Sequence, residues 1–225
     1  MLIVHRDLLQ GTEEWHEVRR GVLTASVVGK LITPTLKVAS NEGSRTLAFT
    51  LAAERITRHI DDGFHGSDMA RGQWDEPHAR DAYAALHGPV DEVGFIVREA
   101  DGLRIGCSPD GLVGDVGMVE IKSRLQRLQL RTILDDVVPA EYMAQIQAEL
   151  YVTGRAWCDF VSYCGGMPLY VKRVYPDGLW QRAIETAWQA LEADVALAIS
   201  RYRSAVDGLP LTERIPYDLD IQIGA

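Results

Sequence analysis

Two repeat patterns of apolar residues divide the sequence into expected helices and strands. Apolar residues recur three to four positions apart, as on the buried face of a helix, over 46–60, 141–153 and 179–202. Short apolar runs bounded by glycine or turn residues instead predict strands at 105–107, 118–121, 156–163 and 169–175. Helices and strands therefore alternate along the chain, with a polar loop at 33–44 and a turn at 61–66.

Two short helices are expected near the N-terminus. Thr12 is a good N-cap for the first, two glutamates follow it in the first turn, and Gly21 ends it. The second helix would be capped by Thr24 or Ser26. A helix N-terminus with hydroxyl groups close to Arg19 suits a phosphate group. Two capped surface helices with a solvated arginine explain the same residues.

A further helical stretch over 69–83 contains Pro77. Proline lacks a backbone N–H, so either a helix begins at Pro77 or Pro77 kinks a longer helix. Glu76, directly before the proline, is on its own typical of a surface carboxylate.

The stretch 104–124 holds the residues with the most chemical content. Turn residues at 114–117 separate its two apolar runs, so we expect these runs to pair as the strands of a hairpin. Side chains alternate along a strand, which places Glu120 and Lys122 on one face. The hairpin would bring Asp110 back toward that face. Two carboxylates and one ammonium group would then share a small volume.

The types and spacing of these three residues suit metal-dependent hydrolysis. Paired carboxylates are hard ligands for Mg²⁺ or Mn²⁺, and a neighbouring lysine can hold or deprotonate an attacking water. Asp110, nine intervening residues and Glu120-Ile121-Lys122 resemble the PD-(D/E)xK nuclease signature, with Pro109-Asp110 as its first part. The motif is short, however, and a Glu-x-Lys on an exposed strand edge is usually an ordinary ion pair.

Length and composition are ordinary for one globular domain, which we expect over 1–225. The chain is 47% apolar and 24% charged. Three cysteines without metal-ligand spacing predict free thiols in a reducing cytoplasm and argue against an iron–sulfur cluster. No apolar run approaches the ~20 residues of a membrane span, and the first residues do not form a signal peptide.

The net charge of −9 argues against a nucleic-acid-binding protein unless basic residues are concentrated where the strand runs. One such concentration follows the central stretch. Ser123 is expected to cap a helix on which Arg124, Arg127 and Arg131 form one basic stripe beside Lys122. A solvated helix face is the usual explanation for such a stripe, and contact with a phosphate backbone is the alternative.

Four blocks of the sequence, in order, resemble the phage-lambda-type exonucleases of viral recombination systems (YqaJ-like). The blocks are QGTEEWHEVRRGVLTAS, ARGQWDEPHARDAY, GCSPDGLVGDVGMVEIKS and YMAQIQAELYVTG, and they extend from Gln10 to Gly154. Four ordered blocks agree by chance far less often than one short motif. The resemblance implies an α/β fold with a restriction-endonuclease-like core, in which helices flank a mixed central sheet of about five strands.

The same resemblance implies a catalytic centre. Asp110 and Glu120, with the backbone carbonyl of Ile121 and the further acid Glu76, would hold the metal. Lys122 would be the catalytic lysine. The cofactor would be Mg²⁺, with Mn²⁺ as a substitute and two ions in each active site.

It also implies contacts around that centre. Gln145 would lie near the active site, although the pair Gln147 and Tyr151 resembles a related nuclease motif and could take that place. Met69 would be an apolar wedge at the duplex fork, with a core methionine as the alternative. The residues that would hold a 5′ phosphate are Arg19, Ser26 and Ser108. Pro77, directly after the glutamate, departs from the family pattern.

The activity implied is digestion of linear double-stranded DNA from the 5′ end, which leaves a 3′ single strand for recombination. A single-strand annealing protein would be the partner, and three subunits would form a ring with Arg124, Arg127 and Arg131 in its channel. The setting would be the cytoplasm of a bacterial host, with a phage or prophage gene. An endonuclease or junction resolvase on the same scaffold, and a catalytically silent DNA-binding protein, are the alternatives.

Overall fold

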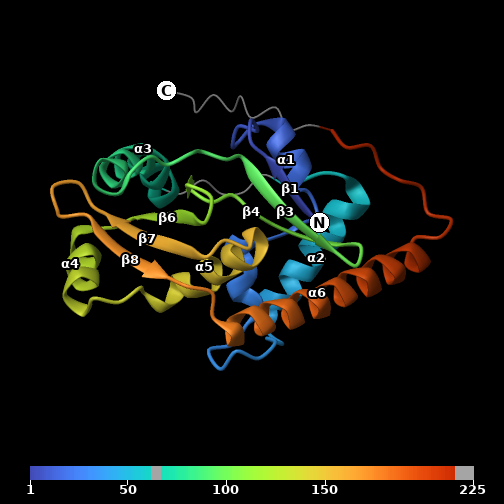
Figure 1. Cartoon of the computed structure of the whole chain (residues 1–225). Coiled ribbons are helices and arrows are strands. Elements are labelled where there is room, and N and C mark those ends of the chain that lie inside the picture. The colour runs from blue at the N-terminus through green and yellow to red at the C-terminus, as the bar shows by residue number, and fades with distance from the viewer. Residues whose placement is uncertain (62–66, 216–225) are drawn as a thin grey trace.

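The computed structural model of the chain describes residues 1–61 and 67–215, in which strands and helices alternate (Figure 1). The expected turn at 61–66 lies almost wholly outside the described residues. In chain order the elements are β1 (Leu2–His5), α1 (Glu13–Arg19), β2 (Leu23–Thr24), the 3₁₀ helix η1 (Ala25–Leu31), α2 (Glu42–Thr57), α3 (Ser67–His87), β3 (Phe95–Ala100), β4 (Leu103–Cys107), β5 (Gly111–Val113), β6 (Gly117–Ser123), α4 (Gln126–Asp135), α5 (Ala140–Thr153), β7 (Trp157–Tyr163), β8 (Tyr170–Val174) and α6 (Gly178–Ala205).

The strands form two mixed sheets of four, in the orders β1-β3-β4-β2 and β5-β6-β7-β8. Most neighbours are antiparallel, but β2 runs parallel to β4, and β6 runs parallel to β7. The predicted α/β class is confirmed. The prediction of one sheet with about five strands is wrong, because the strands of the described residues divide equally between two sheets.

The predicted hairpin is also wrong in its partners. The apolar runs 105–107 and 118–121 are strands, but β4 pairs with β3 in the first sheet and β6 pairs with β5 in the second. The three residues of β5 are too few to give a periodic pattern in the sequence. It is β5, and not the run 105–107, that pairs with β6. Gly114, with a φ of 52°, lies in the turn that joins β5 to β6. Asp110 directly precedes β5 and still reaches β6.

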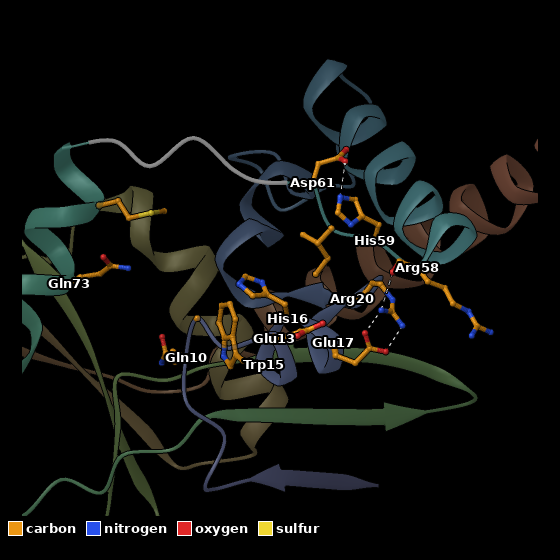
Figure 2. Close-up of a pocket in the computed structure, with 13 residues that line it drawn as sticks. Gln10, Glu13, Trp15, His16, Glu17, Arg20, Arg58, His59, Asp61 and Gln73 are labelled. Carbon is orange, nitrogen blue, oxygen red and sulfur yellow. Dashed lines mark hydrogen bonds and ion pairs between the residues drawn. The ribbon is translucent and has the colours of Figure 1, made fainter. Parts of the chain in front are cut away.

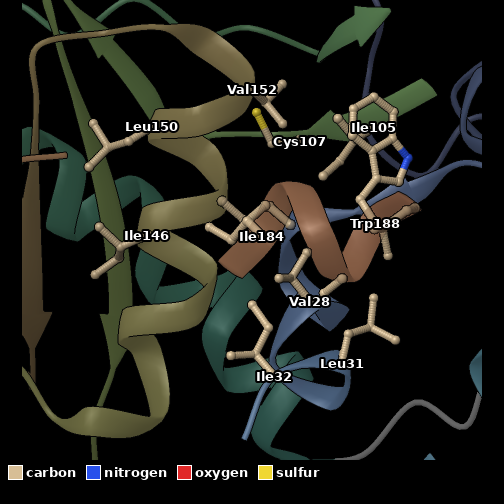
Figure 3. Packing of buried hydrophobic residues seen from close by; sticks show 14 of the residues in the cluster. Val28, Leu31, Ile32, Ile105, Cys107, Ile146, Leu150, Val152, Ile184 and Trp188 are labelled. Carbon is tan, nitrogen blue, oxygen red and sulfur yellow. The ribbon is translucent and has the colours of Figure 1, made fainter. Parts of the chain in front are cut away.

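One hydrophobic core joins the two sheets. It takes Ile105 from β4, Phe160 from β7, Ile146 from α5, Ile184 from α6 and Val28 from η1, all at most 1% exposed. Helix α5 contacts β3 and β4 of the first sheet and β7 of the second, and it lies between them in Figure 1. Figure 3 shows side chains of α5, α6, η1 and β4 meeting in this core. The residues on α5 are therefore held between both sheets.

Several predicted helix ends differ from the structure. Asn41 caps α2 through a capping box, which starts this helix before the predicted residue 46. The second N-terminal helix is a 3₁₀ helix, and Thr24 occupies its N-cap position as predicted. The Thr24 hydroxyl makes no capping hydrogen bond and lies 3.2 Å from the hydroxyl of Ser26 instead. Ser123 ends β6 instead of capping a helix. Gly154 ends α5 in the left-handed conformation, as expected.

Helix α3 continues through Pro77, so of the two alternatives for this stretch the longer helix is correct and a helix start at Pro77 is not. Its inward side chains Ala79 and Tyr83 are completely buried against Val119 and Val161 of β6 and β7. This packing fixes α3 over the second sheet, which brings Glu76 toward β6.

The C-terminal segment after α6 forms no helix or strand up to Ile215, where the described residues end. Its large apolar side chains Leu209, Leu211 and Ile215 are exposed. The last described residues therefore add no helix or strand to the fold. Within the described part of the chain, none of the helices combines the length and the hydropathy needed to cross a membrane.

Replacing Ile184 by alanine should destabilise the protein by about 2–5 kcal/mol, because the change opens a cavity in the core that joins the sheets. Leu197→Ala on the same helix is the matched control. Leu197 is 58% exposed, so its loss should change the free energy of unfolding by about 0.5 kcal/mol or less. Urea denaturation measures both, and equal effects would contradict the placement of the core.

Candidate active site

The three residues of the central motif meet at the start of β5 and the end of β6. The Nζ of Lys122 lies 2.5 Å from Oε1 of Glu120, so the two side chains share a face as predicted. Oδ2 of Asp110 accepts a 2.5 Å hydrogen bond from the backbone N–H of Ile121, between them. Glu120 is only 1% exposed. The group is therefore an enclosed arrangement of charges and not an ion pair on an open strand edge.

Gln145 of α5 completes this group. Its Nε2 donates to Oε1 of Glu120 at 2.6 Å, and its Oε1 accepts from the ammonium of Lys122 at 3.2 Å. Gln147 points elsewhere and donates to the carbonyl of Tyr175, and Tyr151 lies against Trp188. Of the two alternatives for the glutamine, the structure places Gln145 at the site and the Gln147/Tyr151 pair away from it.

Glu76 reaches the same region from α3. It forms an ion pair with Arg80, one turn later on the helix, and Arg80 also donates to the carbonyl of Asp110 at 2.9 Å. Burial, above all, raises the pKa of Glu76, and the charge of Glu120 adds to the shift. Arg80 was not among the predicted residues. The spacing of four residues between Glu76 and Arg80 on a helix could have predicted their ion pair.

Glu149 is a second residue that the sequence patterns missed. It lies on α5 one turn after Gln145, and its Oε1 accepts a 3.0 Å hydrogen bond from the same Nε2 that contacts Glu120. Glu149 is 1% exposed, and its Oε2 has no hydrogen-bond partner among the described residues. The spacing to Gln145 predicts a shared helix face but not that this face is buried.

Negative charge exceeds positive charge in this cluster. Burial first, and then the charge of Glu120, hold the pKa of Asp110 and of Glu149 well above the usual carboxyl range. Burial alone would lower the pKa of Lys122, but Glu120 and Asp110 raise it above its usual value. Lys122 therefore stays protonated, and it is one ammonium among several carboxylates.

The cluster fits a divalent cation, although its side chains are not drawn together around one point. Over residues 1–61 and 67–215, no three histidine, cysteine or acidic side chains converge closely enough to enclose an ion. Magnesium usually keeps several waters and binds proteins through one or two carboxylates. Asp110, Glu120 and the carbonyl of Ile121 suit that sparse coordination. Oε2 of Glu120 is buried without a partner among the described residues, which leaves a ligand atom available.

A small pocket adjoins the cluster. It has a volume of about 180 Å³, enough for several waters at about 30 Å³ each. The three predicted phosphate-binding residues Arg19, Ser26 and Ser108 all line it, as do Gln145 and Glu149 of the cluster. The remaining lining residues are Gln10, Trp15, Thr24, Ala25 and Cys107.

Arg19 is held in this pocket without an acidic partner. Its guanidinium lies 3.8 Å from the centroid of the Trp15 ring, and its Nη1 lies 3.5 Å from Oγ of Ser108. It forms no ion pair with any described residue. Burial lowers the pKa of Arg19 to about 10, so the side chain still carries its charge at neutral pH. A positioned cation without a carboxylate suits an anionic ligand.

The predicted basic stripe does not form. Arg124 precedes α4 and is only 8% exposed, and its guanidinium contacts the hydroxyl of Tyr142 and lies 3.4 Å from Glu141. Arg127 and Arg131 lie on α4 and are exposed. The helix starts later than predicted, so Arg124 cannot share its face. DNA contact by the three arginines stays a prediction.

Met69 lies in the first turn of α3 and is 51% exposed, so the core alternative is wrong. It lines a larger cavity of about 780 Å³ among α1, the end of α2 and the start of α3. Figure 2 shows Gln73 of α3 across this cavity from Trp15 of α1. The cavity shares Gln10 and Trp15 with the small pocket, so the two spaces adjoin.

The model of the YqaJ-like viral recombinase domain matches residues 14–156, which include every residue of the cluster and of the pocket except Gln10. The chain belongs to this family. No curated protein sequence matches the chain.

Solved structures agree with the family. The chain is 33% identical to an alkaline exonuclease (LHK-Exo) from Laribacter hongkongensis, with 88% of this chain and 100% of that chain covered and a TM-score of 0.77. The complex of LHK-Exo with dAMP matches at the same identity and coverage with a TM-score of 0.76. A phage-related exonuclease from Haemophilus somnus 129PT is 13% identical, with 80% of this chain and 96% of that chain covered and a TM-score of 0.56, which shows the fold alone.

The four sequence blocks therefore identified the YqaJ-like family correctly. The family and the exonuclease relatives support a nuclease, in agreement with the predicted class of enzyme.

Removing one charge from the cluster should stabilise the metal-free protein. A carboxyl whose pKa is higher in the folded state than in the unfolded state favours folding most when the pH is below its unfolded-state pKa. This contribution to the free energy of unfolding is lost as the pH rises through the folded-state pKa. Asp110→Asn keeps an acceptor for the Ile121 N–H but removes the buried charge. The variant should melt at a higher temperature than the wild type in EDTA at pH 8, and the difference should shrink toward pH 5. A variant less stable than the wild type at pH 8 would contradict the charge balance described above.

Proposed function

We propose that the protein is a divalent-metal-dependent 5′-to-3′ exonuclease that digests linear double-stranded DNA and leaves 3′ single-stranded overhangs. One observation carries this proposal. The pocket that holds Arg19 and the carboxylate cluster share Gln145 and Glu149, so an anion in the pocket lies directly beside the cluster. A terminal 5′ phosphate bound by Arg19 would bring the first phosphodiester of the strand toward Asp110 and Glu120.

The residues of the cluster would divide the chemistry among them. Asp110, Glu120 and the carbonyl of Ile121, with Glu76 nearby, would hold Mg²⁺ or Mn²⁺, two ions in each site. The bound cations would activate water and stabilise the leaving oxygen. Lys122 has a raised pKa, so we assign it to donating hydrogen bonds to the water or the phosphate instead of accepting a proton. Gln145 orients both Glu120 and Lys122.

The larger cavity would admit the DNA end. It opens beside the pocket and carries Met69, which we propose as the wedge that separates the strands. The relative of known structure binds dAMP, a deoxynucleoside monophosphate of the kind that such a reaction releases.

Assembly into a ring would keep the protein on DNA, which its net charge does not favour. A chain with a charge of −9 has no broad positive field to retain DNA. A ring of three subunits with the exposed Arg127 and Arg131 toward the channel would retain it topologically. A single-strand annealing protein would receive the 3′ strand, in the cytoplasm of a bacterium.

Circular DNA tests the proposed function. A linear duplex and a covalently closed plasmid are incubated with the protein and Mg²⁺, with EDTA as the control. An exonuclease shortens the linear duplex and leaves the plasmid intact. Nicking of the plasmid would identify an endonuclease or resolvase, and binding without cleavage of either DNA would identify a silent DNA-binding protein.

Asp110→Asn, Glu120→Gln and Lys122→Ala should each abolish Mg²⁺-dependent cleavage, because each removes a charge from the site and little or no core volume. The variants should remain folded and bind DNA ends in Ca²⁺, measured by circular dichroism and a gel-shift assay. Near-normal cleavage by any one of them would remove that residue from the catalytic group.

Arg19→Ala should reduce the preference for a 5′ phosphate over a 5′ hydroxyl by about 10- to 100-fold, since one charge-assisted contact is worth about 1.5–3 kcal/mol. The ratio of digestion rates on the two ends measures the preference. Arg45→Ala is the matched control, because Arg45 pairs with Glu42 and lines neither the small pocket nor the larger cavity. An unchanged ratio in Arg19→Ala would show that Arg19 does not bind the phosphate.

A further inference from the structure

The small pocket contains an acidic side chain where an anion is expected to bind. Glu149 lines it together with Arg19, Ser26 and Ser108. A carboxylate and a phosphate in one small pocket repel each other, and Glu149 is only 1% exposed, so bulk solvent screens its charge little. A phosphate site therefore requires something that offsets the charge of Glu149.

The described residues supply that compensation only in part. Glu76 pairs with Arg80, and Asp110 accepts the Ile121 N–H. The charge of Lys122 also acts on Glu149, but Lys122 forms its ion pair with Glu120. Among the described residues, the one hydrogen bond of the Glu149 carboxylate comes from the neutral amide of Gln145, and its Oε2 is left unsatisfied at 1% exposure. A buried carboxylate without a cation is costly, so it either takes up a proton or binds a cation.

The other oxygen atoms that line the pocket favour binding of a cation over protonation. Glu149 supplies a carboxylate, and Ser26 and Gln10 line the same pocket with a hydroxyl and an amide; such oxygens are the hard ligands of Mg²⁺, Mn²⁺ or Ca²⁺. Glu149 and Glu120 also lie within 3.0 Å and 2.6 Å of the same Gln145 nitrogen, so the two negative charges reinforce each other. An added cation is attracted by both.

We propose that Glu149 is a cation ligand of the pocket, and that the divalent ion it binds is shared with the terminal 5′ phosphate of the DNA. This inference rests on the proposed function, because it takes the pocket to be the phosphate site. The pocket is then a joint cation–phosphate site in which Arg19 contacts the phosphate and the ion joins the phosphate to Glu149. Recognition of a phosphorylated end depends on a divalent cation even when no bond is cut.

The test measures binding of DNA ends without cleavage. Two hairpin duplexes are compared, one with a 5′ phosphate and one with a 5′ hydroxyl at the open end. Fluorescence anisotropy gives the dissociation constant of each hairpin in EDTA and in Ca²⁺. In the wild type, Ca²⁺ should increase the preference for the phosphate by about ten-fold, the size of one charge-assisted contact. In Glu149→Gln, the preference should be the same with and without Ca²⁺. Glu185→Gln, an exposed charge on α6, is the control and should behave as the wild type.

Glu149→Gln distinguishes an ionised Glu149 that binds a cation from a neutral, protonated Glu149, because glutamine has the shape of a protonated glutamate. A neutral Glu149 predicts that the variant keeps the full Ca²⁺ effect, and that result would overturn the inference. A wild-type preference for phosphate that ignores Ca²⁺ would overturn it as well and leave the exonuclease proposal standing. Absence of any preference for phosphate would defeat the phosphate pocket and the inference together.

A count of bound ions keeps the inference testable if Glu149→Gln folds poorly. Paramagnetic resonance of Mn²⁺ gives the number of ions bound to Lys122→Ala, which keeps Glu149 and is expected not to cleave, with a 5′-phosphorylated hairpin and with a 5′-hydroxyl hairpin. The phosphorylated end should add one tightly bound Mn²⁺ relative to the hydroxyl end. Equal counts for the two ends would contradict a shared ion.

Discussion

The amide of Gln145 holds two buried carboxylates together, and the chemistry proposed for the protein rests on this contact. Its Nε2 donates to both Glu120 and Glu149, and its Oε1 accepts from Lys122. Burial first, and then repulsion from Glu120, raise the pKa of Asp110 and of Glu149. The cluster therefore persists only because something rigid holds it.

The hydrophobic core provides that rigidity. Helix α5 carries Gln145 and Glu149 on one face and Ile146 and Leu150 in the core between the sheets. Strand β6 carries Glu120 and Lys122 at the centre of the second sheet, and α3 covers its outer face. Burial of apolar surface offsets the repulsion of the carboxylates. The same arrangement opens the cluster to the pocket that Arg19 lines, so the proposed metal ligands and the proposed phosphate-binding residues lie side by side.

The sequence predicted the parts of this arrangement that depend on local pattern. Helical periodicity located α5 and α6, glycine located the end of α5, and strand alternation placed Glu120 beside Lys122. The resemblance to the family located the three phosphate-binding candidates, which the structure gathers in one pocket.

The errors come from contacts between distant parts of the chain. An apolar run such as 105–107 has the same pattern whichever strand it pairs with, so its pairing with β3 instead of β6 could not be predicted. Glu149 has the polarity of a surface residue, and only the packing of α5 between the sheets buries it. Arg124 lies outside the helix that was predicted to carry it, because α4 begins two residues after Arg124, at Gln126.

Binding of a divalent cation to the protein alone tests the central claim, that buried carboxylates without enough positive charge create the active site. The measurement is the melting temperature in EDTA and in increasing Mg²⁺, without DNA. Binding to the native state at 100 times the dissociation constant contributes about 2.7 kcal/mol. The account predicts that Mg²⁺ raises the melting temperature of the wild type by several degrees, and that the double variant Asp110→Asn/Glu120→Gln loses the increase. A melting temperature of the wild type that does not change with Mg²⁺ would contradict the claim.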